Sequence, residues 1–145
     1  MTTLVELDNQ RKEIVEISNV VKGMMNPEQL RIGAIAKVTH ILLCDLFRKM
    51  DEHMADEHKD VLPSLLNHED QAIKNAAWGL INNDKLVRPE FNKYAKRWLK
   101  DCEFQFTDAF LEDTNEILAC IDQRMDIEYQ NMYAKVVPTE VTLSH

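Results

Sequence analysis

The chain has 145 residues, which is enough for one domain with a single hydrophobic core. It contains only three Gly and four Pro, and this argues against a β-sandwich or barrel that needs many tight turns. Its formal net charge of −8 disfavours nucleic acids and anionic membranes as partners, because both carry negative charge.

Other features of the composition suggest a cytoplasmic protein. No apolar run approaches the roughly 18 residues that a membrane span requires. The first residues, Met1–Glu6, lack the basic and then apolar pattern of a signal peptide. Three cysteines without a CxxC motif are typical of reduced thiols in a cytoplasm: Cys44, Cys102 and Cys120.

The first half of the chain predicts two long amphipathic helices. The first runs from about Thr3 to Met25 and ends before the Asn26-Pro27 pair, and Arg11 lies in the middle of its apolar stripe. The second runs from Pro27 to about Leu62. Pro63 is expected to kink or end the second helix, because proline lacks a backbone donor and clashes with the preceding turn.

The second half predicts two more helices. The third starts near Asp70, and a weak stretch around Asp84 together with Pro89 predicts either one kinked helix or two short collinear ones. A turn is expected at residues 101–104. The fourth helix runs from about Phe106 to Val136 and places Glu128 on its apolar stripe.

Four long helices with short connections predict an all-α fold. The expected architecture is an antiparallel up-down-up-down four-helix bundle that occupies residues 1–137. Residues 138–145, which follow Val137 and begin with Pro138, are expected to form a C-terminal tail.

Each predicted helix carries a polar residue on its otherwise apolar face. His53 and Glu57 continue the stripe of the second helix, so burying that stripe turns both inward, one helical turn apart. Burial of a lone carboxylate costs roughly several kcal/mol unless a partner is present. The alternative is that the charge-rich segment Arg48–Asp60 faces solvent at the rim of the bundle.

Several short motifs resemble the hemerythrin family, in particular its bacterial HHE cation-binding branch. The segment His53–Glu57 resembles the HxxxE pair of the family's second helix, and Leu62-Pro63 resembles its usual helix end. The aromatic run Phe91–Trp98 resembles part of the third helix. In Arg124–Tyr133 an arginine precedes a glutamate by four residues, as in the family's fourth helix.

The resemblance covers nearly the whole chain and implies a hemerythrin-like bundle with a non-haem di-iron or related metal centre. Members of the family bind oxygen, sense oxygen or redox state, or respond to nitric oxide. Three residues match ligand positions of the family: His53, Glu57 and Glu128.

The ligand set that the resemblance implies is incomplete. Arg11 stands where the family has a histidine on its first helix. A guanidinium cannot bind a metal ion, but it pairs well with carboxylates. We therefore predict that Arg11 neutralises Glu57 and Glu128 in place of a metal. Weaker candidates for the site are Asp84, Arg124 and His58.

The sequence shows no catalytic constellation: no nucleophile with a paired base, no Gly-rich phosphate loop and no CxxC knuckle. We expect a non-enzymatic regulatory or protein-binding module in signalling, with a degenerate metal site and no cofactor. An unidentified protein is the expected partner, and a homodimer is left open. The alternative is a non-haem iron protein that binds oxygen or senses oxygen, redox state or nitric oxide.

Overall fold

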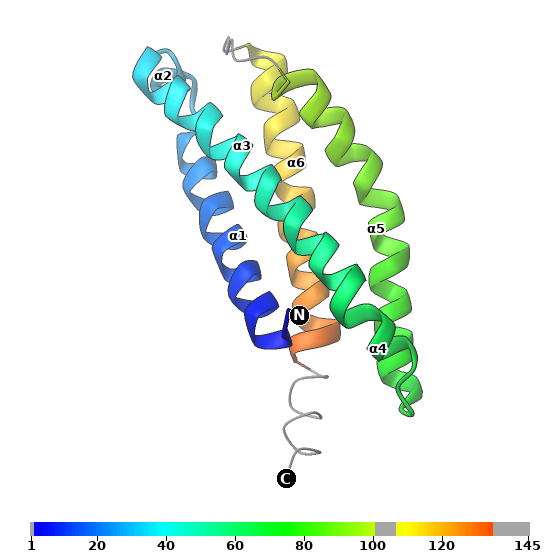
Figure 1. Cartoon of the computed structure of the whole chain (residues 1–145). Coiled ribbons are helices and arrows are strands. Elements are labelled where there is room, and N and C mark those ends of the chain that lie inside the picture. The colour runs from blue at the N-terminus through cyan, green and yellow to red at the C-terminus, as the bar shows by residue number, and fades with distance from the viewer. Residues whose placement is uncertain (1, 101–106, 135–145) are drawn as a thin grey trace.

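The computed structural model describes residues 2–100 and 107–134, and every element of regular structure in them is helical. The prediction of an all-α fold is therefore confirmed. The long helices are α1 (Leu4–Met24), α3 (Gly33–Asp56), α5 (Gln71–Trp98) and α6 (Asp108–Glu128). They lie side by side (Figure 1). Within the described ranges, no helix is both long enough and apolar enough to cross a membrane.

Side-chain caps fix where most of these helices begin. The Thr3 hydroxyl accepts a hydrogen bond from the backbone N–H of Glu6, and the Asp70 carboxylate accepts one from Ala72. Thr107 caps α6 in the same way. Such caps satisfy N–H groups that have no partner within the helix, so these polar residues define helix starts that hydrophobic periodicity leaves open.

The predicted second helix is not continuous. A short helix, α2 (Pro27–Leu30), comes first, and α3 starts only at Gly33. Between them Ile32 has an extended backbone, with φ −81° and ψ 112°. This residue breaks the run of helical dihedral angles, so the prediction of one helix from Pro27 to Leu62 is wrong at its N-terminal end.

Two π-helical turns extend the long helices, and both begin at or next to a glutamate. The turn η1 (Glu57–Val61) follows α3 and leads into α4 (Leu62–Leu66), while η2 (Tyr129–Tyr133) follows α6 directly after Glu128. The helical path therefore continues past Pro63, which lies in the first turn of α4. Single π-turns occur frequently at functional sites.

The third predicted segment forms one helix. α5 is continuous from Gln71 to Trp98, through the weak stretch at Asp84 and through Pro89. The turn expected at residues 101–104 and the tail expected at residues 138–145 lie outside the described residues.

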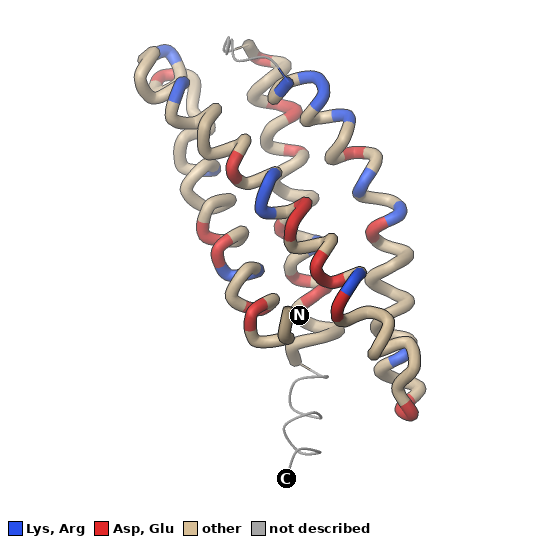
Figure 2. The backbone as a smooth tube through the Cα atoms, in the orientation of Figure 1, with Lys and Arg blue, Asp and Glu red and all other residues tan. Residues whose placement is uncertain are grey.

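The core has two apolar clusters. One includes Leu46, Phe47 and Tyr94, with the Phe47 ring stacked on the Tyr94 ring at 5.1 Å between centroids. The other includes Leu7 and Leu62 and contains residues of η1, α4 and η2. Figure 2 shows that charged residues concentrate on the half of α3 nearer to α4. The candidate site lies in this half of the molecule.

Packing in the first cluster predicts a large cost for truncation. Leu46 is fully buried, so Leu46→Ala should lower the free energy of unfolding by about 2–5 kcal/mol, because it leaves a cavity. The matched control is Leu86→Ala at a side chain that is 74% exposed, with an expected change below about 0.5 kcal/mol. Urea denaturation of both variants measures the difference, and equal effects would contradict the described packing.

Candidate functional site

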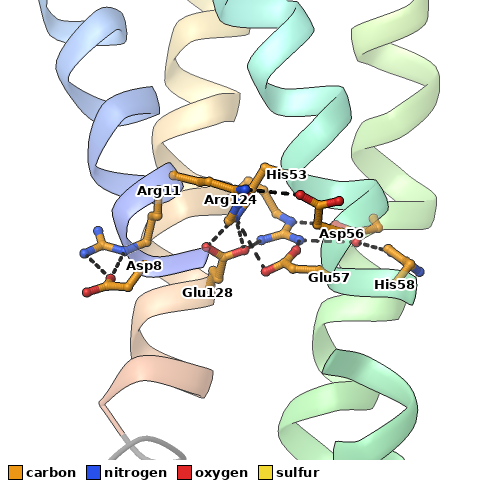
Figure 3. Close-up of polar contacts among 10 residues, drawn as sticks. Asp8, Arg11, His53, Asp56, Glu57, His58, Arg124 and Glu128 are labelled. Atoms are coloured by element: carbon orange, nitrogen blue, oxygen red, sulfur yellow. Dashed lines mark hydrogen bonds and ion pairs between the residues drawn. The ribbon is translucent and has the colours of Figure 1, made fainter. Parts of the chain in front are cut away.

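Five ionisable side chains from α3, η1, α5 and α6 meet inside the protein. Figure 3 shows His53, Glu57, Arg124 and Glu128 pointing toward one another. We call them the polar layer: His53, Glu57, Asp84, Arg124 and Glu128. Four of them are fully buried and Asp84 is 3% exposed. The burial of His53 and Glu57 confirms that the apolar stripe of the second predicted helix continues through them. The alternative, that this segment faces solvent at the rim, is wrong for these two residues.

Two pairs, each one helical turn apart, face each other in the polar layer. His53 and Glu57 come from α3 and η1, and Arg124 and Glu128 come from α6. His53 Nε2 lies 2.8 Å from both carboxylate oxygens of Glu128 and 3.6 Å from Glu57 Oε2. Arg124 donates to Glu57 Oε1 at 2.7 Å and to Glu128 Oε1 at 2.9 Å. Each basic side chain therefore contacts both glutamates.

Arg124 also reaches the third carboxylate. Its Nε donates to Asp84 Oδ1 at 2.5 Å, and its Nη2 donates to Asp84 Oδ2 at 3.3 Å. His58 approaches the same carboxylate from the rim, with Nε2 2.8 Å from Asp84 Oδ2. All three guanidinium nitrogens are thus bonded, and they bind carboxylates from η1, α5 and α6.

Arg11 does not join the polar layer, so the prediction that it neutralises Glu57 and Glu128 is wrong. Its guanidinium pairs with Asp8, one turn earlier on α1, at 2.9 Å. The same group lies over the ring of Tyr129 at 4.9 Å and that of Tyr133 at 5.6 Å. A local carboxylate and two aromatic rings therefore hold Arg11 outside the layer, and Arg124, one turn before Glu128, takes the central role.

The contribution of α1 to the site is Gln10, which the sequence analysis missed. Gln10 Oε1 lies 2.9 Å from His53 Nδ1, and Gln10 Nε2 donates to Asp56 Oδ2 at 3.1 Å. The signal was available in the sequence: Gln10 is at helical spacing from Leu7 and Ile14, which are both buried.

The charges of the polar layer do not balance. Three carboxylates contact one guanidinium, which leaves two negative charges in excess when His53 is neutral and all three carboxyl groups are ionised. Burial lowers the pKa of His53, although the charge of Glu57 opposes this. Burial, and then the charge of Glu128, raise the pKa of Glu57 well above its usual range. Burial therefore favours a proton on Glu57.

Three groups of the polar layer are arranged as ligands for one cation. His53 Nε2 and one oxygen each from Glu57 and Glu128 lie within 4.8 Å of one another. Among the described residues Glu57 Oε2 has no hydrogen-bond partner, although it is buried. One imidazole and two carboxylates suit divalent zinc, iron or manganese. A cation at this point would satisfy the unpartnered oxygen and balance the excess charge, so the residues present fit a metal ion.

Comparison of the chain with protein-family models, with curated proteins and with solved structures gave no match. The resemblance to the hemerythrin family therefore stays a prediction that rests on the motifs of the sequence.

The charge arrangement predicts that Arg124 is far more important for stability than Arg11. In chelator-treated protein, Arg124→Ala should lower the free energy of unfolding by about 3–5 kcal/mol, because it leaves buried carboxylates without their partner. Arg11→Ala is the matched control and should cost about 1–2 kcal/mol, since it removes one partly exposed ion pair and two ring contacts. Equal losses in urea denaturation would contradict the central role of Arg124.

The raised pKa of Glu57 predicts a pH-dependent stability in the metal-free protein. The unfolded chain releases this proton near pH ~4.3, while the folded chain keeps it to higher pH. The folded state thus binds more protons in this window, so the free energy of unfolding should fall as the pH rises. Glu57→Gln removes the titrating group and should flatten this part of the curve.

Urea denaturation of the wild type and of Glu57→Gln, from about pH 4.5 to about pH 8, isolates the contribution of Glu57 as a difference. Glu52→Gln, at an exposed side chain of α3, is the control and should leave the wild-type slope unchanged. A wild-type slope that Glu57→Gln leaves unaltered would show that Glu57 is ionised throughout.

Proposed function

We propose that this protein is a non-enzymatic regulatory domain that binds one divalent transition-metal ion through His53, Glu57 and Glu128. The observation that carries the proposal is the convergence of these three side chains in a fully buried layer with two excess negative charges. The proposed fold is a hemerythrin-like up-down-up-down bundle. Packing of α1 on α3, of α5 on α6 and of α1 on α6 supports it.

The proposed stoichiometry is one ion per chain, because Arg124 takes the place of a second cation. Its guanidinium bonds Glu57 Oε1 and Glu128 Oε1 as well as Asp84. A guanidinium keeps its charge at every accessible pH and would repel a second metal ion beside it. Glu57 Oε2, Glu128 Oε2 and His53 Nε2 are left for the one ion.

His53, Glu57 and Arg124 would have different roles in binding the ion. His53 would offer the lone pair of Nε2, Glu57 would give up the proton that burial favours, and Arg124 would hold the two glutamates in place from the outer side. The bound ion supplies positive charge and, if it is iron, a redox-active centre. Binding joins α3, η1 and α6, so we infer that the ion controls the stability of this region rather than a reaction.

A metal-free protein-binding module is the second candidate, and one observation favours it. Arg124 already bonds all three carboxylates, and His53 Nε2 lies within 2.8 Å of Glu128, so most polar groups of the layer have partners without an ion. In that case the excess charge is balanced by protons on the layer. The two candidates differ in whether purified protein holds metal.

Elemental analysis separates them. Protein expressed in medium supplemented with iron, zinc and manganese should hold about one ion per chain in total, and Glu57→Gln should lose most of it. Glu52→Gln is the control, because its exposed carboxylate pairs with Arg48 outside the layer. Protein that holds no metal and takes up none after stripping would favour the metal-free module. Two ions per chain would contradict the account of Arg124.

A further inference from the structure

A series of three hydrogen-bonded side chains links α1 to the candidate metal site. Asp56, the last residue of α3, accepts a hydrogen bond from Gln10, and Gln10 contacts His53. His53 then faces Glu57 and Glu128 with its other ring nitrogen. Asp56 and Gln10 are partly buried, whereas His53 is fully buried. The hydrogen-bonded series therefore runs from the rim of the protein to its interior.

The Asp56 carboxylate decides which way the Gln10 amide points. An ionised carboxylate only accepts hydrogen bonds, so the donor end of the amide, Nε2, faces Asp56 Oδ2 at 3.1 Å. The acceptor end, Oε1, then faces His53 Nδ1 at 2.9 Å. Because Oε1 has no hydrogen to donate, the bond requires a proton on His53 Nδ1.

The position of that proton fixes the chemistry of the other ring nitrogen. A neutral imidazole has one N–H, so Nε2 presents its lone pair. Nε2 is the nitrogen that lies 2.8 Å from Glu128 and 3.6 Å from Glu57 Oε2. A lone pair directed at carboxyl oxygens is favourable only when one carboxyl group holds a proton that it donates to Nε2, or when a metal ion lies between them. The Gln10 amide therefore leaves the lone pair of His53 Nε2 available to bind a cation.

We propose that Gln10, oriented by Asp56, is a positioning residue that holds His53 in the Nδ1–H tautomer with Nε2 free to bind metal. The role of this tautomer in metal binding rests on the function proposed above, whereas the tautomer itself rests only on the hydrogen bonds. Groups that hold the second nitrogen of a metal-binding histidine commonly change metal affinity by about 10–100-fold when they are removed.

The first experiment needs no variant and no metal. Nitrogen-15 NMR of chelator-treated wild-type protein at neutral pH, with His53 assigned by comparison with His53→Gln, reports which ring nitrogen carries the proton. We expect Nδ1–H and an Nε2 without a covalent proton, which accepts a hydrogen bond from a protonated glutamate of the layer. Observation of Nε2–H, or of protons on both nitrogens, would overturn the proposal.

Variants then test the positioning. Gln10→Leu keeps the bulk but removes the acceptor, so we expect the Nδ1–H preference to be lost and zinc to bind about 10–100-fold more weakly. Asn9→Leu, at an exposed neighbouring position on α1, is the control and should change neither readout.

The two readouts distinguish failure of this inference from failure of the proposed function. Wild-type protein with the Nδ1–H tautomer but no zinc binding would uphold the positioning role of Gln10 and reject the metal site. Zinc binding by the wild type that Gln10→Leu leaves unchanged, with an unchanged tautomer, would uphold the metal site and overturn the role of Gln10.

Discussion

The interaction on which the rest of the site depends is the contact of the Arg124 guanidinium with three buried carboxylates. Glu57, Asp84 and Glu128 come from η1, α5 and α6, so one cation holds three elements of the protein together. Burial opposes the charge on Arg124, but Glu57 and Glu128 outweigh it and raise the pKa of the guanidinium further. Since this charge is permanent, any adjustment of charge in the polar layer must come from the other residues.

The polar layer is consequently asymmetric. It is built from two similar pairs, His53 with Glu57 and Arg124 with Glu128, and a π-turn begins at or directly after each glutamate. On one side the cation is a side chain that cannot leave. On the other side an imidazole and an unpartnered carboxylate oxygen face a place that a proton or a metal ion can take. Under the proposed function, a proton or a metal ion is exchanged on the side of His53.

Helical periodicity was sufficient to predict the buried positions of His53, Glu57, Asp84 and Glu128, because in a helix spacing alone decides which residues share a face. It was not sufficient for Ile32 or the π-turns, which depend on backbone hydrogen bonds. The choice between Arg11 and Arg124 also lay beyond it. Both arginines have a carboxylate one turn away, and only the packing of the helices shows that one pair is buried and the other is covered by tyrosine rings.

Stability alone does not explain why so many ionisable groups share one buried layer. Buried ion pairs are often no more stabilising than apolar side chains of similar size, since desolvation offsets much of their attraction. A network that served only to join the helices would be expected to match its charges and satisfy its acceptors. Here the carboxyl groups outnumber the guanidinium three to one, Glu57 Oε2 lacks a partner among the described residues, and Gln10 directs the lone pair of His53 toward the same point. These three features coincide where a cation would bind, and a cation accounts for all of them at once.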